Sequence, residues 1–211
     1  MSTSTEKVAE KHRLNETWVM WYDYQDKKFT NVDNWSDSLQ TLGKVSDAEG
    51  FWGLTNEIGD TQELPISSNL HFFRNGIQPM WEDKRNMEGG KWVLELISGN
   101  TVQHIWSQTL LFCISELTNM KVPRTNNSVL EVTDATVDKT MDSVICGAVL
   151  SPRKNFIRIS IWTSVKDSRV MKVGSLWKEF AEIPETQKIN FKAHESAMKG
   201  SRELTQDVYS L

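Results

Sequence analysis

Alternation of apolar and polar residues predicts several β-strands in this chain. The run 157–162 (IRISIW) alternates strictly, so its isoleucines face one side of a strand while Arg158, Ser160 and Trp162 face the other. The polar, cationic segment 150–155 before it is expected to connect the two strands of a hairpin. Further strands are expected at residues 17–24, 70–73, 91–97, 143–149 and 187–192.

Three other segments carry apolar residues at helical spacing. The first follows the capping box Ser46-Asp47-Ala48-Glu49, in which the Ser46 hydroxyl and the Glu49 carboxylate can satisfy backbone N–H groups at a helix start. The second runs from Val102 to Leu117, and the third from Ser168 to Glu182. Sequential hairpins with few parallel crossovers, interrupted by three helices, predict an antiparallel α+β domain.

Length and charge narrow the class of protein. The 211 residues suit one domain, which we expect to span residues 12–211 after a disordered polar tail of residues 1–11. A formal net charge of -4 argues against a broad basic surface that coats nucleic acid, but it leaves room for a pocket that reads one nucleotide. No apolar run is long enough to span a membrane, and no signal-peptide pattern is expected.

The two cysteines, Cys113 and Cys146, fit neither a disulfide framework nor the spacing of metal ligands. Reduced, buried thiols are expected in a protein of the cytosol or the nucleus. The sequence also lacks a glycine-rich phosphate loop, a metal-ligand cluster and a nucleophile motif. We therefore predict a protein that needs no cofactor or metal and has no catalytic residues.

Tryptophan is unusually frequent, and two of the nine tryptophans stand in polar stretches. Trp35 lies within DKKFTNVDNWSD and Trp81 within MWEDKRNMEGG, where an indole ring has little core to join. Such rings suggest a stacking surface carried by loops. The alternative is that each ring folds back onto the edge of the domain.

Glu82 directly follows Trp81. A carboxylate beside a stacking ring can accept two parallel N–H bonds from one planar edge. The Watson–Crick edge of guanine offers such a pair, in N1–H and the 2-amino group. The alternative for Glu82 is a solvated surface acid, which is the interpretation we prefer for its neighbour Asp83.

Arg153, Lys154 and Arg158 form a local cationic cluster in a chain that is acidic overall. The cluster suits a di- or triphosphate, because the guanidinium fork binds pairs of oxygens, although it could also be a solvated hairpin end. Together with the two tryptophans and Glu82, it is complementary to a 7-methylguanosine phosphate. The N7-methylated base is positively charged, so both indole faces attract it and its N1–H becomes a better donor to Glu82.

These residues resemble the eukaryotic translation initiation factor 4E family, which binds the mRNA cap. The resemblance covers about residues 12–201, and its most specific part is the run Pro79-Met80-Trp81-Glu82-Asp83 with Gly89-Gly90 after it. The other matching stretches are Asp33-Asn34-Trp35, Phe51-Trp52-Gly53-Leu54, Asn75-Gly76-Ile77-Gln78, Lys91-Trp92, Trp106, Thr109-Leu110-Leu111, Cys146-Gly147-Ala148-Val149 and Ile159-Ser160-Ile161-Trp162-Thr163.

The resemblance implies a curved antiparallel sheet with three helices packed on its convex face and the cap in the concave front. It implies that Trp35 and Trp81 sandwich the base, that Glu82 holds the base edge, and that Trp162 lies by the N7 methyl group. Such a protein binds capped mRNA in translation initiation or its regulation, and we expect it in the cytoplasm and also in the nucleus.

For the phosphates, the resemblance implies contacts from Arg153 and Arg158. Members of the family often carry a lysine two residues after the arginine that matches Arg153. Here that position is Asn155, and Lys154 stands one place earlier.

The resemblance also implies a protein partner: a helical motif of a scaffold initiation factor, or of a competing 4E-binding protein. His12, Leu14 and Trp52 fit the back surface that binds this motif. Trp52 could equally be a core residue of its helix. No membrane is implied as a partner.

Two other classes of protein compete with a cap-binding protein. One is an enzyme that acts on nucleotides or sugars with Glu82 and Asp83 as paired acids, but adjacent residues tend to point apart and make a poor acid–base pair. The other is a carbohydrate-binding module lined by tryptophans, which would not explain the cationic hairpin.

Overall fold

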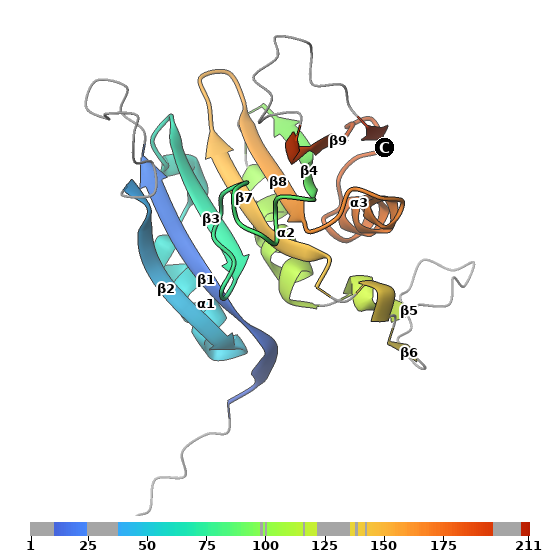
Figure 1. The fold of residues 1–211 in the computed structure, drawn as a ribbon. Helices are drawn as coiled ribbons and strands as arrows, with labels where there is room; N and C mark the ends of the chain where they lie inside the picture. Colours follow the sequence, from blue (N-terminus) through green and yellow to red (C-terminus); the bar gives the residue numbers. More distant parts are fainter. Residues whose placement is uncertain are drawn as a thin grey trace, which may run out of the picture.

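An eight-stranded antiparallel sheet forms the centre of the protein (Figure 1). The computed structural model describes residues 11–24, 38–97, 99, 101–115, 117–121, 136–137, 139–141, 143–195 and 208–211. The strands of the sheet are β1 (Arg13–Tyr24), β2 (Gln40–Asp47), β3 (Ser68–Arg74), β4 (Gly90–Leu96), β7 (Ile145–Pro152), β8 (Ile157–Thr163), β9 (Asn190–Ala193) and β10 (Tyr209–Ser210). They lie in the order β10-β9-β4-β8-β7-β3-β1-β2, and neighbours pair antiparallel.

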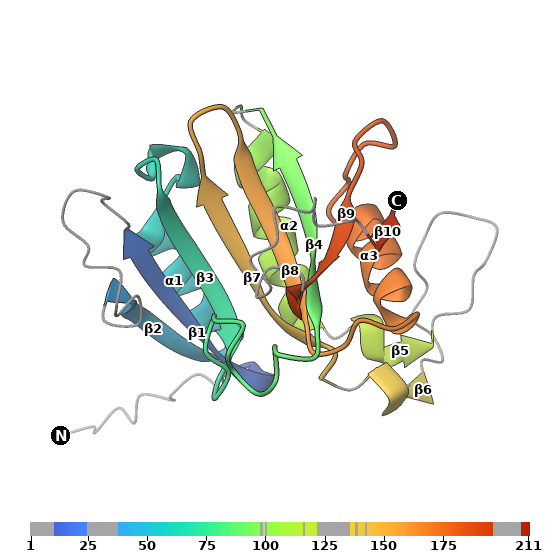
Figure 2. The ribbon, with the colours of Figure 1, turned by 45° about the horizontal axis from the view of Figure 1, so that its top comes forward.

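Three α-helices in the described chain lie on one side of this curled sheet. They are α1 (Ala48–Ile58), α2 (Thr101–Ser115) and α3 (Arg169–Phe180). Figures 1 and 2 show α1 and α2 behind the strands and α3 next to β9. The predicted fold class, a curved antiparallel sheet with three helices on its convex face, is confirmed. None of the described helices combines the length and the apolar composition needed to cross a bilayer.

Short elements complete the described chain. A two-stranded sheet joins β5 (Met120–Lys121) to β6 (Thr136–Val137), and three 3-10 turns occur at η2 (Thr61–Glu63), η3 (Leu117–Asn119) and η4 (Lys139–Met141). The small sheet lies within the segment 118–142, which has no counterpart among the predicted elements.

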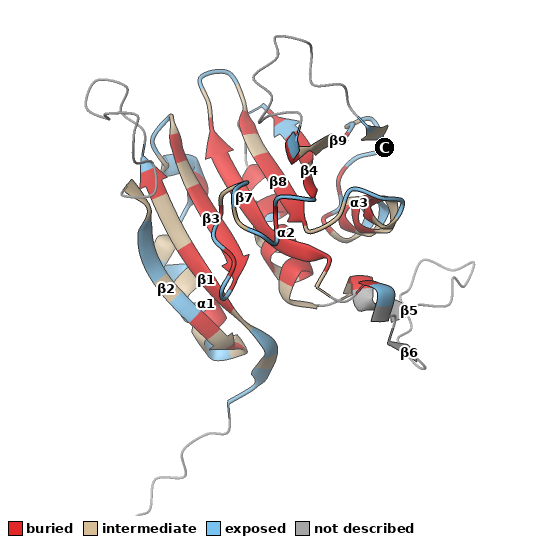
Figure 3. Ribbon diagram, viewed as in Figure 1, coloured by how far each residue is buried: buried red, intermediate tan, exposed pale blue. Residues whose placement is uncertain are grey.

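The core lies between the sheet and the helices, where the central strands β3, β4, β7 and β8 are buried along most of their length (Figure 3). The isoleucines of β8 point into this core while Trp162 belongs to a separate cluster on the other face, so the predicted alternation is confirmed. Four tryptophans of the described chain are almost completely buried in the core, namely Trp18, Trp92, Trp106 and Trp177. The Nε1 of Trp92 donates to the Val170 carbonyl oxygen at 2.8 Å, which satisfies its polar end as burial requires.

The strand β2 was not predicted, because its residues are mostly polar and do not alternate with apolar ones. It is an edge strand, paired only with β1 among the described strands, and within it Val45 is the residue that reaches the core. The remaining positions are mostly exposed and polar, as expected where an edge must resist pairing with other chains. The last strand, β10, was likewise not predicted, and in it Tyr209 pairs with Phe191 of β9.

The start of α1 differs from the predicted capping box. Asp47, not Ser46, is the N-cap residue, and its carboxylate accepts a hydrogen bond from the Gly50 N–H at 2.8 Å. Glu49 instead reaches the residue before β1, where its carboxylate accepts from the His12 N–H at 3.1 Å. The predicted N-cap residue was therefore wrong by one position. Ser46 still belongs to the strand β2, and its neighbour Asp47, the last residue of that strand, caps the helix.

A second apolar cluster lies on the face of the sheet opposite the helices, which we call the front face. This front cluster consists of Phe73, Ile77, Cys146, Val149 and Trp162, with Trp21 packed against it. Ile77 belongs to the loop between β3 and β4, and Figure 1 shows this loop crossing in front of the sheet. The packing of Ile77 therefore places on the front face the loop that carries Trp81 and Glu82.

Candidate functional site

One acidic side chain braces the loop between β3 and β4. The Asp83 carboxylate accepts hydrogen bonds from the backbone N–H groups of Gln78, at 2.9 Å, and Arg85, at 2.8 Å. The Asn86 side-chain amide donates to the carbonyl oxygens of Gln78 and Met80, both at 2.8 Å. The interpretation of Asp83 as a solvated surface acid is therefore wrong, because the residue is half-buried and holds the turn together.

Trp81 and Glu82 are both exposed on this braced loop. The Trp81 side chain is 40% exposed, which is unusual for so large a ring and leaves its surface available for stacking. Because Asp83 is committed to the backbone, Glu82 does not share a paired-acid site with it. Trp35, the predicted partner of Trp81, lies outside the described residues.

Trp162 forms a fixed wall of the front face. Its ring packs edge-on against Phe73, with ring centroids 5.6 Å apart, and lies tilted against His194 at 4.2 Å. The ring is only 8% exposed, and its buried Nε1 has no hydrogen-bond partner among the described residues. A buried donor without a hydrogen-bond partner costs free energy, so a donor of this kind is typical of a site where water or a ligand supplies the missing acceptor.

Two residues beside Trp162 were missed as site residues: Lys91 and His194. The Lys91 Nζ lies 5.3 Å from the centroid of the Trp162 ring. Burial, together with the charges of Arg158, Lys192 and Arg153, lowers the pKa of Lys91 to about 8. Burial and the charge of Lys91 lower the pKa of His194 to about 3, so that imidazole is neutral at physiological pH. An anion in this region would relieve the repulsion on Lys91 and favour its charged form.

The sequence does contain a signal for Lys91. In β4 the buried residues Trp92 and Leu94 point into the core, so Lys91 and Glu95 must point to the front face. The pairing of β4 with β8 then sets Lys91 opposite Trp162. The alternation of side chains along β4 is enough to place Lys91 on the front face, but only the pairing register between β4 and β8 shows that Trp162 is its neighbour.

Arg153 is anchored to the sheet instead of being solvated. Its guanidinium donates from Nη1 to the Pro152 carbonyl oxygen, at 2.8 Å, and to the Ser68 carbonyl oxygen, at 3.2 Å. Its Nη2 donates to Asn69 Oδ1 at 2.8 Å, and the Ser151 hydroxyl donates to the same oxygen at 2.7 Å. The side chain is half-buried, and burial and the nearby Arg158 lower its pKa.

A buried acid supports this arrangement from behind. Asp23 is fully buried, and its carboxylate accepts a hydrogen bond from the Asn69 side-chain amide at 2.6 Å. His71 Nε2 lies 2.9 Å from the other carboxylate oxygen of Asp23. Through Asn69, this network orients the oxygen that holds Arg153. The two strands that supply it, β1 and β3, are far apart in sequence, so no sequence pattern pointed to it.

The other two cations of the cluster are in different states. Arg158 donates from Nε and Nη2 to Oε1 of Glu95, at 3.1 and 2.6 Å, and its guanidinium carbon lies 5.2 Å from the centroid of the Phe156 ring. Lys154 is exposed at the tip of the β7–β8 hairpin. The structure thus brings the three predicted cations to one hairpin, but only Lys154 is a plainly solvated charge.

The predicted partner surface lies on the helical back of the molecule. Trp52 is 49% exposed on α1, while the neighbouring Phe51 enters the core, so the alternative of a core role for Trp52 is wrong. His12 is tied to the start of the same helix, with Nδ1 2.6 Å from Glu49 Oε1, and this pairing raises the pKa of His12. Leu14 is partly buried and packs against the core.

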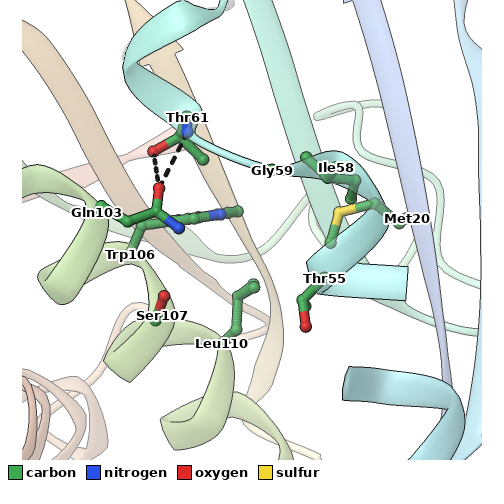
Figure 4. Close-up of a pocket in the computed structure, with 9 residues that line it drawn as sticks. All are labelled: Met20, Thr55, Ile58, Gly59, Thr61, Gln103, Trp106, Ser107 and Leu110. Carbon is green, nitrogen blue, oxygen red and sulfur yellow. Dashed lines mark hydrogen bonds between the residues drawn. The ribbon is translucent and has the colours of Figure 1, made fainter. Parts of the chain in front are cut away.

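A small pocket between α1 and α2 is too small to be an alternative ligand site (Figure 4). Gln103 Oε1 accepts hydrogen bonds there from the Thr61 N–H, at 2.9 Å, and from the Thr61 hydroxyl, at 2.6 Å. The pocket has a volume of about 20 Å³, which can hold one water molecule but not a nucleotide. The described residues also contain no group of three or more acidic, histidine or cysteine side chains placed to hold a metal ion.

The fold and the front face define a class of protein: an α+β domain built on a curled antiparallel sheet, with helices on one side and a candidate ligand-binding face on the other. Exposed aromatic and acidic side chains lie on a braced loop, and a row of cations follows on the adjoining strands. The described acids around the loop are engaged in structure or exposed, and no acid–base pair has formed between Glu82 and Asp83.

Comparison with known proteins identifies the family. The family described as eukaryotic initiation factor 4E matches residues 13–208. Eukaryotic translation initiation factor 4E of Saccharomyces cerevisiae is 32% identical over 189 residues, which cover 89% of this chain and 78% of the yeast protein. The chain belongs to the eukaryotic initiation factor 4E family, whose named relatives are initiation factors and not enzymes.

Solved structures agree with this assignment. The Ascaris suum eIF4E-3 in complex with an m2,2,7G cap has a TM-score of 0.76 and 26% sequence identity, and the match covers 96% of this chain and 99% of that one. The fold also matches Caenorhabditis elegans eIF4E-3 in its complex with the 4E-binding protein Mextli and a cap analog, with a TM-score of 0.76 and 24% identity over 96% of this chain and 100% of that one.

Proposed function

We propose that this protein binds the 7-methylguanosine cap of mRNA and acts in translation initiation or its regulation. The observation that carries the proposal is the exposed Trp81-Glu82 pair, held by the Asp83-braced loop on the front face. Membership of the initiation factor 4E family and the cap bound to the Ascaris relative support it.

In this proposal the base stacks on Trp81 and Glu82 accepts hydrogen bonds from N1–H and the 2-amino group. Trp35 closes the other side of the stack, and Trp162 lies by the N7 methyl group. The methylated base is a cation, so each indole face attracts it, and each stack contributes about 1–3 kcal/mol. The charge also strengthens the two hydrogen bonds to Glu82.

The phosphates of the cap are assigned to Arg153, Lys154 and Arg158, with Lys91 added from the structure. The anchored guanidinium of Arg153 supports the proposal, because a donor that is already ordered loses little entropy on binding. A phosphate that binds Arg158 must compete with or displace the Glu95 carboxylate, so Arg158 contributes less net affinity than an unpaired arginine would.

Titration of the intrinsic tryptophan fluorescence with 7-methyl-GTP and with GTP tests the proposal. Strong quenching is expected with 7-methyl-GTP, and an affinity for GTP about 100-fold lower, because GTP lacks the cationic stacking and the strengthened hydrogen bonds. Equal affinity for the two nucleotides would contradict the stacking of a charged base. An oligosaccharide serves as the control ligand and should leave the fluorescence unchanged.

We also propose that a helical motif of a scaffold initiation factor or of a competing 4E-binding protein binds the back surface formed by His12, Leu14 and Trp52. The exposure of Trp52 supports this, since exposed tryptophan is a common anchor of protein interfaces. Trp52→Ala is expected to weaken binding of such a helical peptide at least tenfold while affinity for 7-methyl-GTP stays unchanged, as measured by calorimetry. Unchanged peptide affinity would refute the surface.

The same proposal assigns residues 12–211 to a single cap-binding domain after a tail of residues 1–11. The family match over residues 13–208 supports this boundary. We place the protein in the cytoplasm and also in the nucleus. Its two cysteines are free and buried, and burial raises the pKa of each thiol to about 12, which suits a reducing compartment.

A further inference from the structure

A cavity of about 350 Å³ opens beside the proposed phosphate site, and no part of the cap is assigned to it. We call it the β9 cavity. Its lining residues are Val93, Glu95, Gln187, Lys188, Asn190 and Lys192. Its size is within the range of small-ligand pockets.

Strand register fixes the place of this cavity on the front face. In the row that crosses β8, β4 and β9, Trp162 pairs with Lys91, and Lys91 pairs with Lys192. In a parallel row, Arg158 pairs with Glu95, which lines the cavity. Neighbouring strands lie about 4.8 Å apart, so the cavity begins about one strand beyond the proposed phosphate contacts.

The lining suits a nucleotide in its chemistry. Lys188 is exposed and Lys192 is half-buried, so both can reach a phosphate at the rim. Asn190 and Gln187 carry amides, and Glu95 carries a carboxylate, which together offer donors and acceptors to the edge of a base. The Gln187 amide is already positioned, because its Nε2 donates to the Glu95 carbonyl oxygen at 3.0 Å.

The charges of this region extend continuously from the cap site. Lys192 and the two arginines of the β7–β8 hairpin all lower the pKa of Lys91, which shows that their positive potentials overlap at that point. A larger cavity of about 560 Å³ beside α3 lacks this property, since three of its lining residues are Glu179, Glu182 and Glu185. Among the described cavities, the β9 cavity is therefore the one suited to a polyanion.

We infer that the β9 cavity binds the first nucleotides that follow the cap in a capped, single-stranded RNA. The inference rests on the proposed cap-binding function. Lys188 and Lys192 contact the phosphates of these nucleotides, and the amides and Glu95 contact a base edge. When a cap phosphate takes the Arg158 guanidinium, the Glu95 carboxylate is released and can accept an amino N–H from that base.

The test compares 7-methyl-GTP with a capped oligoribonucleotide of five residues, using the full chain and its Lys188→Gln/Lys192→Gln variant. The unmodified protein is expected to bind the capped oligoribonucleotide about tenfold more tightly than 7-methyl-GTP. The variant should lose this gain and keep its affinity for 7-methyl-GTP within about twofold. The slope of log K against log salt for the oligoribonucleotide should fall by about 0.7 for each phosphate that the variant no longer neutralises.

Lys44→Gln is the matched control, because Lys44 is an exposed lysine of the edge strand β2 at the far end of the sheet order. It should leave both affinities and both salt slopes unchanged. Equal affinity of the unmodified protein for the two ligands, or an equal loss of both in the double variant, would overturn the β9 subsite alone. Absence of 7-methyl-GTP binding to the unmodified protein would instead overturn the proposed function and, with it, the subsite.

Discussion

Glu82→Ala is expected to abolish measurable binding of 7-methyl-GTP while the fold is retained. The substitution removes both acceptors for the base edge and leaves N1–H and the 2-amino group of a stacked, desolvated base without partners. Hydrogen bonds to a charged group contribute about 1.5–3 kcal/mol each, so the loss corresponds to at least about 100-fold in affinity. Fluorescence titration measures the affinity, and thermal unfolding checks the fold.

The fold should survive because Glu82 is exposed, whereas Asp83 carries the hydrogen bonds of the loop. Glu88→Ala is the matched control, since Glu88 is another exposed acid between β3 and β4. It should bind 7-methyl-GTP normally. Glu82→Gln keeps the size of the side chain but replaces one acceptor with a donor, so an affinity near that of the unmodified protein would refute the paired hydrogen bonds to guanine.

Gly89→Ala is expected to destabilise the protein by about 3 kcal/mol. A Cβ on Gly89 would collide with the backbone carbonyl oxygen of Thr163, at the point where β4 begins beside the end of β8. Backbone cannot rotate away as a side chain can, so the two strands would have to separate locally. Urea denaturation, followed by tryptophan fluorescence, gives the change in the free energy of unfolding.

Gly53→Ala is the control with the opposite sign. Gly53 lies in the middle of α1, is exposed, and has no atom within 4 Å of the position that a Cβ would take. Alanine there should raise the free energy of unfolding by about 0.5–1 kcal/mol, because glycine is the poorer helix former. Destabilisation of equal size at both positions would contradict the steric explanation for Gly89.

The burial of the tryptophans can be predicted only in part from the sequence around each of them. The polar residues around Trp81 correctly predicted that its ring is exposed, because a short polar loop contains few apolar residues for the ring to pack against. The same reasoning made no statement about the core, where Trp18, Trp92, Trp106 and Trp177 are all buried. A helical spacing also left Trp52 undecided between core and surface, and the packing of α1 resolved it by burying Phe51 instead.

Asp83, in the loop between β3 and β4, is a second residue whose role could not be predicted from its neighbours in the sequence. Its sequence neighbours are polar, and they favoured a solvated surface acid. The folded loop places two backbone N–H groups within hydrogen-bond distance of its carboxylate, which local sequence does not specify. The outcome also separates the roles of two adjacent acids, with Asp83 structural and Glu82 exposed.

The sequence by itself determined what depends on local periodicity and on short motifs. Strict alternation assigned Trp162 and Arg158 to one face of β8, helical spacing located three helices, and the run around Trp81-Glu82 carried the resemblance to the initiation factor 4E family. These properties follow from the fixed repeat of side chains along a strand or helix, so a few neighbouring residues are enough to establish them.

The tertiary structure alone decided which side chains from distant segments meet. It set Lys91 beside Trp162, tied Arg158 to Glu95, and anchored Arg153 to Asn69, which is held in turn by Asp23. Each of these contacts depends on the register between strands that are many residues apart, and a shift by one residue would turn every side chain to the other face. The exposed pair Trp81-Glu82, which remains the predicted base-binding pair, could therefore be singled out in the sequence, whereas the surroundings of the cationic residues could not.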